Sequence, residues 1–154
     1  MITEAEAREI EELVKRFPVR KAACIEALQV IQKRRGWVSE ENLRDVARIL
    51  DMTPEELSGV ATFYSQVYQK PVGRHVILIC DSISCWVMGY ENVRDHLTSR
   101  LEIRPGGTTP DGRFTILPIP CLGACDHAPA MMIDDDLHGD LTPEKIDAIL
   151  ERYK

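Results

Sequence analysis

Apolar residues recur at helical spacing through the first part of the chain and give way later to short extended runs. The first apolar face is formed by Ile10, Leu13, Val14 and Phe17. Thr3 and Glu6 precede this face with the spacing of a capping box, and Pro18 follows it. The pattern predicts an amphipathic helix that starts after Thr3.

Three further segments before residue 70 have helical patterns. They cover residues 19–35, residues 41–50 and a stretch that starts at Thr53-Pro54. Gly36 is a stop signal for the first of them, Ser39 is an N-cap for the second, and Pro54 fits the first helical position of the third. Residues 1–72 are therefore expected to form a helical domain.

The pattern of apolar residues changes after Pro71-Val72-Gly73, from helical spacing to short extended runs mixed with helices. The pattern predicts strands at residues 75–80, 114–117 and 131–133, a helix at residues 89–100, and a closing helix from Thr142. Strands mixed with helices over this length predict an α/β (α+β) domain for residues 73–154.

Composition and charge limit the classes of function. The chain has 154 residues, of which 44% are hydrophobic, and a formal net charge of −6. This acidic balance argues against a nucleic-acid binder, and the basic trio at residues 33–35 fits the cationic last turn of a helix. The first residues lack the pattern of a signal peptide, and the longest aliphatic run, residues 76–79, is far too short to span a membrane. We expect a cytosolic chain that reaches any membrane through a partner.

The cysteines carry the strongest chemical signal. Cys80 and Cys85 have four residues between them, and Cys121 and Cys125 have three. Both pairs lie where a predicted strand runs out into a loop, so one fold can bring them together at one end of a sheet. A [2Fe-2S] cluster takes four thiolates, two on each iron, and the spacing of the first pair also occurs in plant-type ferredoxins. The sequence therefore predicts one [2Fe-2S] cluster held by these four residues.

The residues around the cysteines suit a cluster loop. Ser82, Ser84 and the loop amides are candidate hydrogen-bond donors to the sulfurs, and Gly123 would let the backbone approach closely. Pro118 and Pro120 remove two backbone donors before Cys121, so this segment is expected to leave the sheet.

Other readings of the cysteines remain open at this point. A cytosolic set of four thiols also suits structural zinc, and four merely buried cysteines are conceivable. A thioredoxin-type thiol catalyst would need Cys-x-x-Cys, which the sequence lacks. Cys24 fits a small core residue of a helix, and His127 a residue beside the ligands or at the surface. The acidic run at residues 134–136 is expected to be a solvated turn.

The chain resembles the NuoE subunit family of NADH:quinone oxidoreductase, respiratory complex I. The motifs that carry the resemblance are GVATFYS (59–65), PVGRH (71–75), CDSISC (80–85), GRF (112–114), CLGAC (121–125), MMID (131–134) and LTPE (141–144). The resemblance implies an N-terminal helical bundle followed by a thioredoxin-like [2Fe-2S] ferredoxin domain. It also implies a NuoF-type partner that binds FMN and NADH, and a peripheral position on the cytoplasmic side of the bacterial inner membrane.

The sequence is consistent with NADH oxidation in the NuoF-type partner and electron transfer in this chain. It has no Gly-x-Gly-x-x-Gly after a strand, so NADH chemistry is expected in another chain. Two alternatives remain: the equivalent subunit of a soluble NAD-linked hydrogenase or formate dehydrogenase, and a free-standing thioredoxin-like ferredoxin. A further hypothesis is that the helical domain docks onto the flavin subunit. Its candidate aromatic anchors are Trp37, Phe63, Tyr64 and Tyr68.

Overall fold

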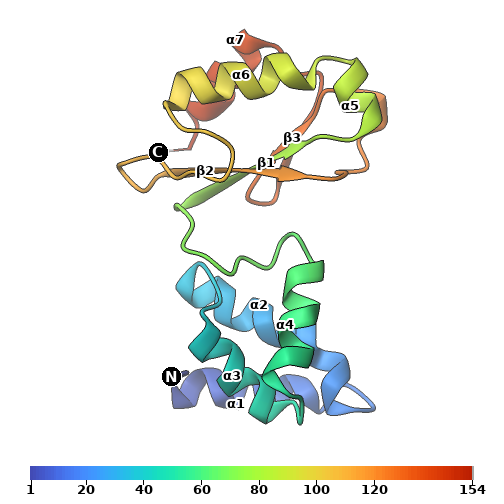
Figure 1. Ribbon diagram of the computed structural model, residues 1–154, viewed down its shortest axis with the longest axis vertical. Helices are drawn as coiled ribbons and strands as arrows, with labels where there is room; N and C mark the ends of the chain where they lie inside the picture. The colour runs from blue at the N-terminus through green and yellow to red at the C-terminus, as the bar shows by residue number, and fades with distance from the viewer. Residues whose placement is uncertain (154) are drawn as a thin grey trace. The chain divides into compact units, whose positions relative to one another are not determined.

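Side chains of Thr3, Ser39 and Thr53 cap the starts of three helices in the first part of the chain. The computed structural model describes residues 1–153 and divides the chain into two units, the first ending at Pro71 and the second starting at Val72 (Figure 1). The helical unit consists of α1 (Glu4–Val14), η1 (Arg20–Ala23), α2 (Cys24–Arg35), α3 (Glu40–Ile49) and α4 (Pro54–Phe63). The capping box predicted for α1 is confirmed, because Glu6 N donates to Thr3 Oγ1 at 3.2 Å and Thr3 N donates to the Glu6 carboxylate at 2.7 Å.

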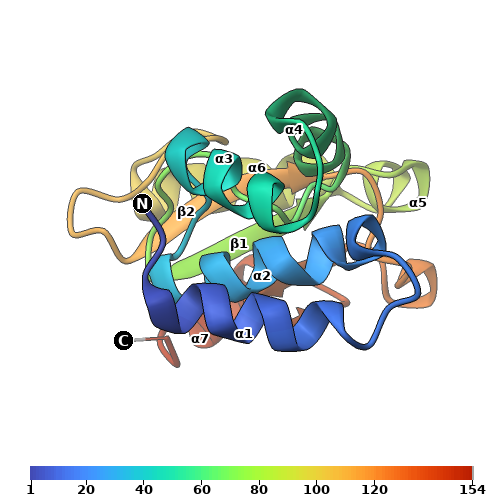
Figure 2. The same cartoon turned by 90° about the horizontal axis from the view of Figure 1, so that it is seen from below.

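The core of the helical unit is aliphatic. Its fully buried members include Ile10, Leu28, Ile31, Leu50 and Leu57. Figure 2 shows α1 and α2 side by side, an arrangement that lets both apolar stripes face this core. The segment predicted as one helix from residue 19 starts as the short 3-10 helix η1 before α2 begins.

A buried ion pair joins α1 to α2. The Arg35 guanidinium donates to the Glu6 carboxylate from Nε at 2.8 Å and from Nη2 at 2.6 Å. Only 4% of the Glu6 side chain is exposed. The hydrogen bonds from Arg35 outweigh the effect of burial and lower the pKa of Glu6 to about 2. The basic end of α2 therefore does more than complement the helix dipole.

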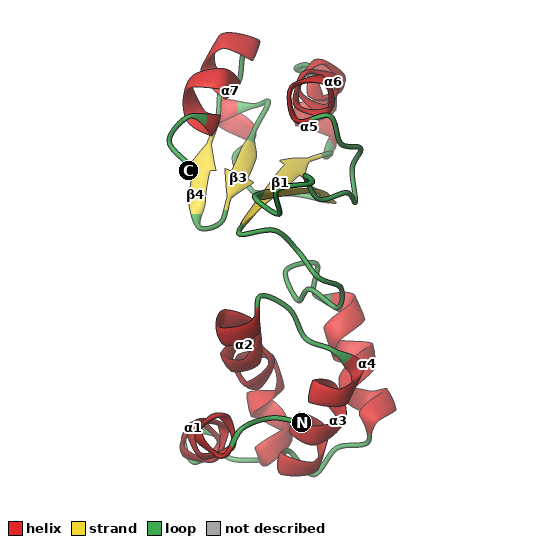
Figure 3. Cartoon of the chain, turned by 90° about the vertical axis from the view of Figure 1, so that its left-hand side faces the viewer, coloured by secondary structure: helices red, strands yellow, loops and turns green. Residues whose placement is uncertain are grey.

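The second unit is a four-stranded mixed sheet with helices on one face. The strands are β1 (His75–Cys80), β2 (Phe114–Ile119), β3 (Met131–Ile133) and β4 (Asp136–His138), in the order β2-β1-β3-β4. β1 and β2 run parallel, whereas β3 runs antiparallel to both β1 and β4. The helices are α5 (Ile83–Val87), α6 (Tyr90–Leu101) and α7 (Pro143–Leu150). α6 and α7 cover the same face of the sheet (Figures 1 and 3).

The predicted exit of the chain from the sheet before Cys121 is wrong in one respect. β2 continues through Pro118, which pairs with Ile79 of β1, and ends at Ile119. β2 is an edge strand, so a residue without an N–H is tolerated on its outer side. The helix α5 and the strand β4 were not predicted from the sequence.

The acidic turn before β4 is also more structured than expected. Asp134 accepts hydrogen bonds from the backbone N–H of Val76 at 3.0 Å and from Nδ1 of His75 at 2.7 Å. These contacts attach the β3–β4 turn to the start of the central strand, so Asp134 is not simply solvated. Within residues 1–153, no helix has the length and apolar character needed to cross a membrane.

Candidate metal centre

The parallel pairing of β1 and β2 determines where the cysteines lie. Cys80 is the last residue of β1, and its register partner is Ile119 at the end of β2. Both strands therefore deliver their loops to the same end of the sheet. The first loop continues into α5, which contains Cys85, and the second carries Cys121 and then Cys125 at the start of η2 (Cys125–His127). The structure thus brings together the two pairs that the sequence separates.

The two pairs differ in their exposure to solvent. Cys80 is 3% exposed and Cys85 1% exposed, whereas Cys121 and Cys125 are exposed. All five cysteines of the chain are free thiols. The buried thiols pack with the small residues Ala124, Ala128 and Ala130. Small side chains leave room beside the sulfurs, because none of them has atoms beyond Cβ.

The electrostatics of Cys85 indicate that three sulfurs lie near one another. Burial raises the pKa of the Cys85 thiol to about 11, and a hydrogen bond with Cys80 and the charges of Cys80 and Cys125 act in the same direction. At neutral pH such a thiol keeps its proton. A cationic metal centre would favour the thiolate form of Cys85, and its binding would release that proton.

A backbone donor in the second loop is directed at a sulfur. Gly123 N donates to Cys121 Sγ at 3.3 Å. The reason for a glycine differs from the prediction: a Cβ at this position would meet no atom within 4 Å, but φ is +74°, a conformation that L side chains rarely adopt. The left-handed turn at Gly123 is therefore what allows the loop to curve around its own cysteine.

The two serines of the first loop contribute backbone acceptors to α5. The Ser82 carbonyl accepts from Trp86 N at 2.8 Å and the Ser84 carbonyl accepts from Met88 N at 3.0 Å. Their backbone oxygens form the turns of α5 and so position Cys85 within it.

The donor set matches a binuclear cluster in number and kind. Four free cysteines, in two pairs, supply the two thiolates that each iron of a [2Fe-2S] cluster takes.

The remaining candidates lie outside this thiol set. His127 is exposed and its Nδ1 lies 2.8 Å from Asp140 Oδ2, and the hydrogen bond with Asp140 raises its pKa. Cys24 packs against the core of the helical unit, as a small core residue would.

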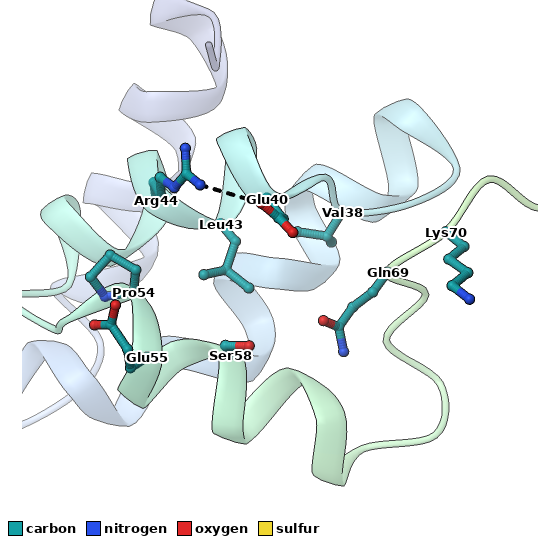
Figure 4. Close-up of a pocket in the computed structure, with 9 residues that line it drawn as sticks. All are labelled: Val38, Glu40, Leu43, Arg44, Pro54, Glu55, Ser58, Gln69 and Lys70. Carbon is teal, nitrogen blue, oxygen red and sulfur yellow. Dashed lines mark hydrogen bonds and ion pairs between the residues drawn. The ribbon is translucent and has the colours of Figure 1, made fainter.

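The helical unit contains a separate open hollow of about 550 Å³ (Figure 4). It lies between α3, α4 and the segment at Gln69 and Lys70, and its charged groups include the paired Glu40 and Arg44, 3.3 Å apart. The lining residues drawn in Figure 4 include no cysteine, so this hollow is separate from the thiol set.

Relatives of known identity resemble the chain over almost its whole length. It is 49% identical over 153 residues to the E subunit of the NADH-quinone oxidoreductase of Escherichia coli (strain K12), covering 99% of this chain and 92% of the relative. The corresponding protein of Pseudomonas aeruginosa is 46% identical, with the same coverage of each chain.

The chain is also similar to a solved structure and to the profile of a protein family. An NAD+-reducing [NiFe]-hydrogenase in the air-oxidised state matches with a TM-score of 0.71 and 27% identity, over 85% of this chain and 22% of the hydrogenase chain. The profile of the thioredoxin-like [2Fe-2S] ferredoxins matches residues 10–154. With both cysteine pairs at one end of its sheet, the chain belongs to the thioredoxin-like [2Fe-2S] ferredoxin family.

Proposed function

We propose that the chain is the electron-transfer NuoE subunit of an NADH-quinone oxidoreductase and holds one [2Fe-2S] cluster. We assign the cluster ligands as Cys80, Cys85, Cys121 and Cys125. The observation that carries this assignment is the pairing of Cys80 with Ile119, which sends both cysteine loops out at one end of the sheet. The identity of 46–49% to NuoE proteins over nearly the full chain supports the choice of complex.

Each part of the site has a role in electron transfer. When bound, the cluster supplies a store for one electron, which suits a flavin that takes two from NADH and releases them singly. Buried Cys80 and Cys85 keep water away from one side of the site. The Gly123 N–H stabilises negative charge on the Cys121 sulfur, and exposed Cys121 and Cys125 keep the path to an external cofactor short.

The partner that fits this role is a NuoF-type subunit that binds FMN and NADH, in the peripheral arm of the complex on the cytoplasmic side of the bacterial inner membrane. The chain lacks a dinucleotide fingerprint of its own, so it depends on such a partner for NADH oxidation. The similarity to the hydrogenase supports a second candidate, the equivalent subunit of an NAD-linked hydrogenase. Its 27% identity is well below the 46–49% to the NuoE proteins, which favours the oxidoreductase.

Metal analysis of anaerobically prepared protein tests the proposal. We expect about two irons and two acid-labile sulfides per chain, and an EPR signal after reduction by dithionite. Alanine at any of the four proposed ligands should abolish or strongly destabilise this signal, whereas the matched control Cys24→Ala should preserve it. Stoichiometric zinc without iron in native protein would refute the cluster, and signal loss in Cys24→Ala alone would refute the ligand set.

A further inference from the structure

The end of β4 lies at the end of the sheet where the cysteine loops emerge. In β3, which runs antiparallel to β1, Met131 pairs with Ile79 near the end of β1. In β4, which runs antiparallel to β3, the last residue, His138, pairs with Met131. The chain therefore leaves β4 at the same end of the sheet as the two ligand loops. We call the segment that follows, residues 139–141, the β4–α7 connection.

The turn that begins with Cys125 depends on contacts from other segments. All three residues of η2 are exposed, so this turn is not held by packing in the core. It is closed by the hydrogen bond that His127 N donates to Ala124 O at 3.0 Å. Whatever fixes the position of His127 therefore also fixes the turn that carries Cys125.

The β4–α7 connection contacts His127 at its backbone and at its side chain. Asp140 N donates to His127 O at 2.7 Å, and His127 Nδ1 donates to the Asp140 carboxylate at 2.8 Å. A further backbone hydrogen bond runs from Leu141 N to Pro129 O at 3.2 Å. These bonds join the connection to the segment that directly follows Cys125.

Gly139 packs directly against His127. A Cβ at position 139 would overlap with His127 Cβ and would lie 2.7 Å from His127 O, closer than real Cβ atoms approach other atoms. The φ of Gly139 lies outside the left-handed region. Close approach, and not backbone conformation, is therefore what requires a glycine here.

The β4–α7 connection is itself anchored to the core of the ferredoxin unit. Leu141 is 7% exposed and belongs to the same hydrophobic core as Ile146 of α7. Lys145 Nζ donates to Gly139 O at 2.5 Å. Because the connection is fixed to the core on one side and packs against His127 on the other, it holds the exposed turn in a defined position.

We propose that Gly139 and Asp140 are positioning residues for the cluster ligand Cys125, an inference that rests on the proposed function. They act through His127, which ends the turn that Cys125 begins. Sites that bind a metal group need ligands whose geometry is fixed by the surrounding residues. Removing outer contacts of this kind typically changes metal affinity about 10–100-fold.

Cluster lifetime and EPR spectra of the full chain test the proposal. We expect Gly139→Ala to shift the g values of the dithionite-reduced cluster and to accelerate cluster loss to a chelator about tenfold or more. Asp140→Ala should shift the g values in the same way and accelerate cluster loss about fivefold. Asp140→Asn should keep the wild-type values, because Asn retains an acceptor for His127 Nδ1 and tolerates the φ of +51° at this position.

The matched controls have the same local features at positions away from the cysteines. Asp134 has a φ of +54° and accepts a hydrogen bond from His75 Nδ1 at 2.7 Å, but it lies beside the start of β1. Gly107, in the loop before β2, is also confined, because a Cβ there would lie 2.9 Å from Arg104 O. Asp134→Ala and Gly107→Ala should lower Tm but leave the g values unchanged and cluster loss within about twofold of the wild-type rate.

The outcomes distinguish this proposal from the proposed function. Wild-type g values and cluster lifetimes in both Gly139→Ala and Asp140→Ala would overturn the positioning role. Equal changes in the controls would also overturn it, because the contacts would then act only through the stability of the unit. If Gly139→Ala does not fold, the comparison of Asp140→Ala with Asp134→Ala decides. Absence of iron from the wild-type chain would instead overturn the proposed function, and with it the inference that rests on it.

Discussion

Replacing Glu6 by Gln should destabilise the helical unit by about 3 kcal/mol at neutral pH. The carboxylate is almost fully buried and accepts hydrogen bonds from Arg35 and from Thr3, and its pKa falls from 4.5 to about 2. Each unit of pKa corresponds to about 1.4 kcal/mol, so the folded unit favours the charged carboxylate by about 3 kcal/mol. Glutamine keeps the shape but removes the charge, and leaves the Arg35 guanidinium without its counterion.

The destabilisation should depend on pH in a defined direction. Because the pKa of Glu6 is lower in the folded chain than in the unfolded chain, the charge contributes fully above about pH 4.5. The contribution is lost as the pH falls towards the folded value of about 2. The difference in stability between the wild type and Glu6→Gln should therefore be constant above this window and shrink within it.

Urea unfolding followed by fluorescence measures this difference. Trp37 lies in the helical unit and Trp86 in the other, so a Trp86→Phe background makes Trp37 the only indole reporter. The matched control is Glu9→Gln, because the ion pair of Glu9 with Arg34 is exposed and should contribute little. Equal stability of Glu6→Gln and the wild type at pH 7, or a difference that persists unchanged to pH 2.5, would refute the reasoning.

Three further predictions concern the ferredoxin unit. Gly123→Ala should strain the left-handed turn by about 1–2 kcal/mol and accelerate cluster loss to a chelator, measured by the decay of visible absorbance; an unchanged decay rate would contradict this. Pro118→Ala should leave thermal stability nearly unchanged, because the edge strand does not need the added N–H; a large shift in Tm would argue against the edge position. The isolated holoprotein should accept electrons from dithionite but not from NADH, and direct NADH oxidation would overturn the division of labour.

The elements that the sequence predicts well are those whose apolar residues face a core. The central strand β1 is buried from Val76 to Cys80, and its aliphatic run is readable without a structure. Thr3 and Thr53 mark helix starts because their side chains accept hydrogen bonds from the third helical residue in each case. In such places local chemistry and tertiary packing favour the same structure.

The elements that cannot be predicted from the sequence are those whose apolar residues do not face a core or whose local chemistry does not indicate their structure. In α5 the aliphatic and aromatic side chains point to solvent and the cysteine is buried, so no apolar face indicates a helix. β4 is three residues long and begins with Asp136, and it depends on pairing with β3 and on hydrogen bonds of Asp136 and His138 with the distant Tyr153. The spacing of the cysteines likewise predicts one site. That Cys80 and Cys85 are buried while Cys121 and Cys125 are exposed depends on long-range strand pairing, which spacing does not reveal.

The two edges of the sheet also affect how the chain behaves before it meets a partner. An unpaired edge is a template on which another polypeptide can add a strand and begin to aggregate. Here one edge, β2, contains Pro118, which lacks a donor, and the other, β4, is three residues long and starts with the charged Asp136. Neither edge offers a long row of free donors and acceptors. A newly made chain is thereby protected from joining its own copies through backbone pairing while it awaits assembly.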